Sequence, residues 1–140
     1  MTYHAATNVL VIDDSDVARE QMAEQLRRAG FHVSTLASPI GATRVIVDQS
    51  IDVVVIDVQM PSIRGDRLAA LFKGNRRFAA LGVILVTGAG ETELSQLGAL
   101  AKADAVLSKA RLDQLAEIVR RTYRKYHSSR PPPSSRHAAR

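Results

Sequence analysis

The chain has 140 residues, of which 46% are hydrophobic and 24% charged, and this suits one domain with an ordinary soluble core. It contains no cysteine, which excludes disulfide bonds, thiolate metal sites and cysteine nucleophiles. The net charge is +5, but residues 120–140 hold seven Lys and Arg and no acid, so the basic character belongs to this end. No apolar run reaches the roughly 18 residues of a membrane span, and the N-terminus lacks the pattern of a signal peptide. We therefore expect a cytoplasmic protein.

The first part of the chain alternates expected strands with expected helices. Residues 9–12 form an unbroken apolar run, which is typical of a strand buried on both faces of a parallel sheet. A helical period follows over residues 15–29, and Gly30 is well placed to end that helix. Residues 31–36 indicate a weaker strand. A Ser-Pro pair, the pattern of an N-cap followed by proline at the first helical position, opens an expected helix over residues 38–47.

The rest of the chain repeats this alternation. The expected elements are a strong strand, a helix, a strong strand, a short helix, a weak strand and a final helix, over residues 53–56, 66–73, 83–86, 91–100, 105–107 and 112–126. The expected apolar faces include Val17 in the first helix and Leu71 in the third. Five strands that alternate with five helices predict a parallel sheet covered by helices on both faces. Ligands of such sheets bind beyond the carboxyl ends of the strands, where the strand order reverses.

Polar residues stand at the ends of the expected strands. Asp13 and Asp14 follow the first strand, Asp57 follows the third, Thr87 the fourth, and Lys109 lies just past the fifth. Carboxylates gathered in one cleft raise each other's pKa unless a counter-charge is present. Mg²⁺ is the hard cation that best suits a few carboxylates, several waters and phosphate oxygens. The pattern therefore predicts a Mg²⁺ site with an ammonium and a hydroxyl beside it.

This set of groups suits phosphoryl transfer to a carboxylate. The transition state spreads negative charge over three equatorial oxygens, so catalysis consists mostly of positioning and electrostatic stabilisation. A carboxylate nucleophile would yield an aspartyl-phosphate. Asp57 is the best candidate because it is the lone acid at the end of the most apolar strand. Asp13 and Asp14 are then left to hold the metal.

The chain resembles the response-regulator receiver domains of two-component signal transduction, which are CheY-like. Four segments carry the resemblance: the first strand with its acidic pair (residues 9–15), an Asp-x-x-Met-Pro-x-x-x-Gly segment (57–65), a Val-Thr-Gly segment (86–88) and a Leu-Ser-Lys segment (107–109). The match covers roughly residues 7–126, which would be the receiver domain. The resemblance implies a doubly wound, flavodoxin-like (βα)5 sandwich whose five-stranded parallel sheet has the order 2-1-3-4-5.

The resemblance also implies a role for each site residue. Asp57 would accept a phosphoryl group from a phosphohistidine on a sensor histidine kinase or a histidine phosphotransfer protein. Lys109 would pair with one phosphoryl oxygen, and Thr87 would donate a hydrogen bond to another. The implied Mg²⁺ ligands are the carboxylates of Asp13, Asp14 and Asp57 and the backbone carbonyl of Gln59. Such a protein catalyses its own phosphorylation and dephosphorylation without being a conventional enzyme.

The output implied by the resemblance is a change in protein–protein contacts. It would act on the face formed by the fourth helix, the fifth strand and the fifth helix, through which a dimer could also form. The family usually has Tyr or Phe where this chain has Val106, and commonly has Pro where this chain has Ala110. A β-branched aliphatic side chain cannot make the ring swing that reports the switch hydroxyl. We therefore expect a working phosphorylation site with an altered output surface.

Two other functions are weighed against this one. A receiver fold can serve as an interaction module without phosphorylation, but such a module would be expected to lose the acids and the lysine that are present here. A haloacid-dehalogenase-like phosphatase also places an Asp nucleophile after an apolar strand. That family needs a second acid two residues further on, where this chain has Gln59, and the chain is short for an enzyme with a substrate cap.

Residues 127–140 are basic and rich in Pro and Ser, which is the composition of a flexible tail or linker. A second reading is an arm that contacts nucleic acid or membrane. The chain fits either a stand-alone protein that acts on a downstream protein target, or the receiver of a longer regulator or hybrid kinase with a fused output domain.

Overall fold

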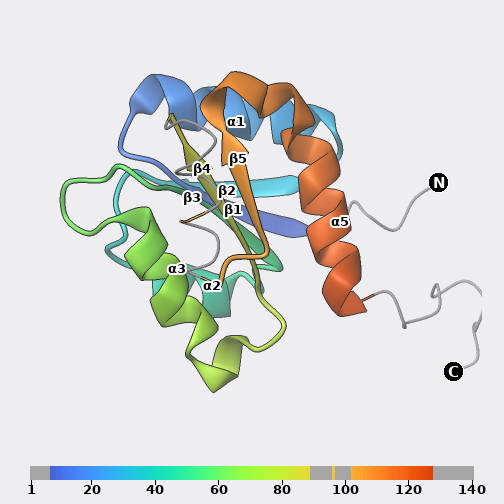
Figure 1. Ribbon diagram of the computed structural model, residues 1–140. Coiled ribbons are helices and arrows are strands. Elements are labelled where there is room, and N and C mark those ends of the chain that lie inside the picture. The colour runs from blue at the N-terminus through green and yellow to red at the C-terminus, as the bar shows by residue number, and fades with distance from the viewer. Residues whose placement is uncertain (1–6, 89–95, 97–101, 128–140) are drawn as a thin grey trace, which may run out of the picture.

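The computed structural model describes residues 7–88, 96 and 102–127, and its centre is one parallel β-sheet (Figure 1). The strands lie in the order β2-β1-β3-β4-β5, which confirms the predicted fold class. Each of the four strand pairings is parallel. The strands are β1 (Asn8–Ile12), β2 (His32–Leu36), β3 (Val53–Asp57), β4 (Gly82–Thr87) and β5 (Ala105–Ser108). The strand order reverses between β1 and β3, so the carboxyl ends of these two strands border the expected ligand position.

Helices cover both faces of the sheet, as Figure 1 shows. α1 (Asp16–Arg28) and α5 (Leu115–His127) pack on one face, whereas α2 (Ala42–Asp48) and α3 (Gly65–Lys73) pack on the other. Two short 3₁₀ helices, η2 (Arg76–Phe78) and η3 (Lys109–Gln114), lie in the connections. The helix expected over residues 91–100 lies, apart from residue 96, outside the described residues. In the part of the chain that is described, no helix combines the length and apolar character that a bilayer crossing needs.

α1 begins and ends as its sequence predicts. The Ser15 hydroxyl accepts a hydrogen bond from the Ala18 amide at 3.3 Å, and Gly30 adopts the left-handed conformation just past the helix. The expected apolar face is wrong at Val17, which is 78% exposed. At 3.6 residues per turn, Val17 lies roughly 180° around the helix from the buried Leu26. Leu71 of α3 is likewise exposed, because it falls outside the face that carries the buried residues of that helix.

α2 begins later than the sequence predicts. Ser38 and Pro39 form a turn in which the Ser38 hydroxyl accepts from the Ile40 amide and the Pro39 carbonyl accepts from the Ala42 amide. Gly41 has φ +85°, a left-handed conformation that no α-helix can continue through. The helix therefore starts after this glycine, at Ala42, rather than at Ser38.

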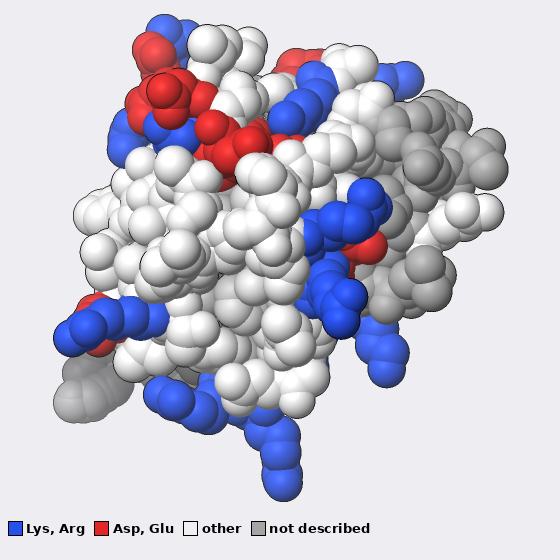
Figure 2. Space-filling model, turned by 90° about the vertical axis from the view of Figure 1, so that its left-hand side faces the viewer, with Lys and Arg blue, Asp and Glu red and all other residues white. Residues whose placement is uncertain are grey.

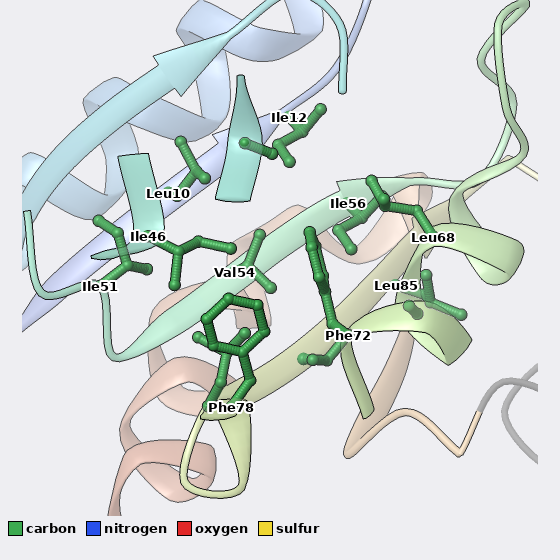
Figure 3. Packing of buried hydrophobic residues seen from close by; sticks show 14 of the residues in the cluster. Leu10, Ile12, Ile46, Ile51, Val54, Ile56, Leu68, Phe72, Phe78 and Leu85 are labelled. Atoms are coloured by element: carbon green, nitrogen blue, oxygen red, sulfur yellow. The ribbon is translucent and has the colours of Figure 1, made fainter. Parts of the chain in front are cut away.

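The core consists of two apolar layers, one on each face of the sheet. Figure 3 shows the layer toward α2 and α3, where strand residues such as Leu10 and Val54 meet helix residues such as Ile46. Their sequence neighbours point to the opposite face and pack against α1 and α5. This double burial explains why the strong strands are apolar throughout. Phe72 and Phe78 meet edge to face in the first layer at a ring separation of 5.8 Å, so both belong to the core.

A buried carboxylate ties the end of α5 to the sheet. Asp104, whose side chain is 2% exposed, accepts hydrogen bonds from the Val83 amide at 2.8 Å, Tyr126 Oη at 2.7 Å and Lys125 Nζ at 2.5 Å. Lys73 Nζ of α3 lies 3.5 Å from the same carboxylate and 2.6 Å from Tyr126 Oη. Burial alone would raise the pKa of Asp104, but these donors outweigh it and the pKa is lowered. The cluster thus joins α3, β4 and α5.

Candidate functional site

The carboxyl ends of the strands bring the predicted acids together. Asp13 follows β1 and Asp57 ends β3, and both side chains are almost fully buried, whereas Asp14 is exposed. One carboxylate oxygen from each of these three residues lies within 4.8 Å of the other two. Figure 2 shows acidic side chains gathered in the upper part of the molecular surface. The edge of the sheet therefore carries a compact group of oxygen ligands, of the kind that holds Mg²⁺.

Lys109 places its ammonium between two of these carboxylates. Its Nζ lies 3.3 Å from Asp13 Oδ2 and 3.3 Å from Asp57 Oδ1. Burial lowers the pKa of Lys109, but the two carboxylates outweigh burial and raise it above its usual value. Burial, followed by the charge of Asp13, raises the pKa of Asp57 although Lys109 acts in the opposite direction. The ammonium thus stays charged and offsets only part of the repulsion between the acids.

The turn after β1 orients Asp13. Its Oδ1 accepts from the Ser15 amide at 2.9 Å, and its own amide donates to the Leu36 carbonyl at 3.1 Å. The buried Asp13 Oδ2 forms the ion pair with Lys109 but has no hydrogen bond within the described part of the chain. The ammonium of Lys109 therefore offsets part of the cost of burying this oxygen, which still has lone pairs free for a second cation. This oxygen fits the predicted metal site, and Asp13 caps the turn as well.

The loop between β3 and α3 holds Asp57 in place. Asp57 Oδ1 accepts from the Gln59 amide at 3.4 Å, while the Gln59 side chain is exposed. The Gly65 amide donates to the Val58 carbonyl at 2.8 Å and closes the loop. A Cβ atom at Gly65 would lie 2.1 Å from the backbone oxygen of Asp57, so any other residue here would force the backbone to move. The sequence gives Gly65 as the end of a motif, but its contact with Asp57 becomes visible only in the fold.

Thr87 and Lys109 lie at the carboxyl ends of the adjacent strands β4 and β5. Thr87 ends β4 and is fully buried, and it pairs in register with Ser108 of β5, the residue before Lys109. The Ser108 hydroxyl accepts from the Ala110 amide at 3.1 Å and caps η3. This cap fixes the start of η3, the short helix that begins at Lys109. Val106 is half-buried and packs against the apolar layer on the α3 face.

The fold and the site together define a doubly wound α/β domain with an acid–lysine centre at its topological switch point. The family model of the response regulator receiver domain matches residues 9–120. The chain therefore belongs to the response-regulator receiver family of two-component signalling, as the sequence motifs predict.

Individual relatives agree with this family. The chain is 27% identical to the TorCAD operon transcriptional regulatory protein TorR of Escherichia coli (strain K12), over 58% of this chain and 34% of TorR. The chemotaxis protein CheY4 of Vibrio cholerae superposes with a TM-score of 0.74 at 25% identity, over 83% of this chain and 98% of CheY4. A response regulator receiver domain protein from Clostridium thermocellum gives a TM-score of 0.74 at 25% identity, over 85% and 95% of the two chains. The chain spans 26% and 42% of two further curated relatives, so such relatives carry long additional segments.

Proposed function

We propose that this domain is the phosphoacceptor of a two-component phosphorelay and that Asp57 takes the phosphoryl group. The observation that carries the proposal is the position of Lys109 Nζ, 3.3 Å from both Asp13 and Asp57, in a site where three carboxylates lie within 4.8 Å. Capping residues or solvated charges would not need this convergence. The reaction is the attack of an Asp57 carboxylate oxygen on phosphorus. An O–P bond forms, the N–P bond of a phosphohistidine breaks, and the imidazole leaves with its electron pair.

The residues at the site fit a Mg²⁺ ion. Asp13, Asp14 and Asp57 with the backbone carbonyl of Gln59 would hold it, and the three carboxylate oxygens that lie within 4.8 Å of one another support this assignment. When bound, Mg²⁺ supplies positive charge for phosphoryl oxygens. Asp13 and Asp14 then have the role of orienting ligands, and Asp57 is both ligand and nucleophile.

Lys109 and Thr87 have the role of stabilising the transferred group. The ammonium of Lys109 already lies beside Asp57 Oδ1 and keeps its charge, so it can pair with a phosphoryl oxygen without a large rearrangement. The Thr87 hydroxyl, at the end of the neighbouring strand, would donate to a second phosphoryl oxygen. Such a change at the end of β4 would shift the balance between two arrangements of the adjacent surface.

The partners follow from the chemistry of the donor. A sensor histidine kinase or a histidine phosphotransfer protein would supply the phosphohistidine, and the output would be a downstream protein target or a fused domain. Part of the expected output face, around residues 91–100, lies outside the described residues. In this proposal residues 7–126 act as the receiver and residues 127–140 as a tail or linker.

Incubation with Mg²⁺ and a small-molecule phosphodonor, followed by intact-mass measurement, tests the proposal. The wild type should gain the mass of one phosphoryl group, and Asp57→Asn should gain none. An unphosphorylated wild type would instead support a pure interaction module. Release of phosphate from small phosphomonoesters would support the phosphatase alternative, and we expect none.

A further inference from the structure

Arg19 clamps the turn that carries the two metal-binding acids. It lies in the second turn of α1, and its side chain is only 14% exposed. Its Nη1 donates to the backbone oxygen of Asp13 at 2.9 Å, and its Nη2 contacts Asp16 Oδ1 at 2.5 Å. One planar guanidinium therefore joins the end of β1 to the first turn of α1, a geometry that Arg can make and a single ammonium cannot.

The clamp acts on the peptide plane that joins Asp13 to Asp14. Asp13 is also held by its amide and its side chain, through Leu36 and Ser15. Asp14 makes no hydrogen bond or ion pair with the part of the chain that the structure describes, and it is exposed. Its direction therefore depends on the orientation of the preceding peptide group, and that group is fixed by Arg19.

The charge of Arg19 counts only in part against a cation at the site. An isolated guanidinium this close to the acids would repel Mg²⁺. The Asp16 carboxylate, which is 85% exposed, pairs with it at 2.5 Å and offsets part of its charge. Lys109 differs because its ammonium lies directly against the site carboxylates of Asp13 and Asp57.

Helix α1 also offers a comparison within the same element. Arg28 pairs with Glu24 at 2.8 Å, but these side chains are 78% and 66% exposed, and Arg28 contacts no site residue. A surface pair of this kind contributes little. Arg19 differs by its burial and by the added bond to the Asp13 carbonyl.

We propose that Arg19 is a positioning residue for Mg²⁺ binding: it preorganises the carboxylates of Asp13 and Asp14 by holding the peptide between them, without touching the metal or the phosphoryl group. The inference rests on the proposed function of the site. Residues that orient metal ligands commonly change metal affinity about 10–100-fold when they are removed.

The test is a Mg²⁺ titration followed by the amide NMR shifts of the site, for the wild type, Arg19→Ala, Arg19→Lys and the control Arg28→Ala. We expect Arg19→Ala to bind Mg²⁺ about tenfold more weakly. Mg²⁺ binding by Arg19→Lys should be weakened as well, because lysine keeps the charge but cannot make both contacts of the guanidinium. The Mg²⁺ affinity of Arg28→Ala should stay within about twofold of wild type. Simple electrostatics predicts the opposite sign for Arg19→Ala, since removing a positive charge would tighten Mg²⁺ binding. Unchanged or tighter binding by Arg19→Ala, or equal weakening by Arg28→Ala, would overturn the inference.

A second measurement does not depend on the metal. The Ser15 amide bonds to Asp13 Oδ1 within the clamped turn, so its solvent exchange in the metal-free protein should rise several-fold in both Arg19 variants and not in Arg28→Ala. Unchanged exchange would contradict the clamp. If the wild type shows no response to Mg²⁺, the proposed function itself is contradicted. If the wild type and Arg19→Ala bind Mg²⁺ equally well, only the role of Arg19 is contradicted.

Discussion

Gly65→Ala tests how closely α3 approaches the end of β3. The added Cβ would lie 2.1 Å from the backbone oxygen of Asp57, 2.7 Å from its carbonyl carbon and 2.9 Å from Ile56 Cγ2. Two of these atoms belong to the backbone of a fully buried strand, so no side-chain rotation can relieve the contact. The start of α3 must retreat by about 1 Å to restore ordinary van der Waals distances. That movement weakens the hydrogen bond from the Gly65 amide to the Val58 carbonyl.

Overpacking of this kind costs about 1–3 kcal/mol, and we expect Gly65→Ala to lose about 3 kcal/mol of unfolding free energy in urea titrations. Phosphorylation of Asp57 should also slow, because the displaced carbonyl belongs to that residue. Gly74→Ala is the matched control: Gly74 follows α3, has φ −84°, and its Cβ would lie 3.3 Å from the Ala70 carbonyl oxygen. A Gly65→Ala protein as stable as Gly74→Ala would refute this account of the β3–α3 contact.

Three further outcomes can be measured on purified protein. Asp57→Asn should raise the unfolding free energy of the metal-free protein at neutral pH by about 1 kcal/mol, because it removes a buried carboxylate whose pKa is raised by burial and by Asp13. For the same reason, the unfolding free energy of the wild type should rise as the pH falls toward the pKa of Asp57. A loss of stability in Asp57→Asn would contradict this account. Tyr126→Phe should lower the unfolding free energy by about 1–2 kcal/mol, and Tyr123→Phe should lower it much less. Because burial raises the pKa of Tyr126 to about 12, the contribution of Tyr126 to stability should be complete below pH 10 and be lost as the pH rises from there toward 12. Phosphorylation-dependent NMR shifts should remain near the site in the wild type and spread along β5 in Val106→Tyr, and equal spread in both proteins would show that the ring is unnecessary.

The sequence predicts which acids lie close together better than it predicts the helix boundaries. Asp13, Asp57 and Thr87 end strongly apolar runs, and parallel strands deliver their carboxyl ends to one edge of a sheet, so their convergence follows from topology. The late start of α2 depends on the left-handed conformation of Gly41, which no hydrophobic period reveals.

Sequence patterns do not predict contacts between a side chain of one segment and the backbone of another. In the sequence, Arg19 has the spacing of an ordinary helix pair with Asp16, and only the fold adds its bond to the Asp13 carbonyl. The contact between Gly65 and Asp57 is of the same kind, because it depends on how closely a helix approaches a strand.

The formal charges around Lys109 bear on the order of events at this centre. Three ionised carboxylates and one ammonium leave two negative charges, and a single divalent ion cancels both. A phosphodonor, itself an anion, would meet an electrically neutral docking point only after the ion has arrived. Under the proposed function, charge balance would therefore favour binding of the divalent ion before the donor arrives, ahead of any bond making or breaking.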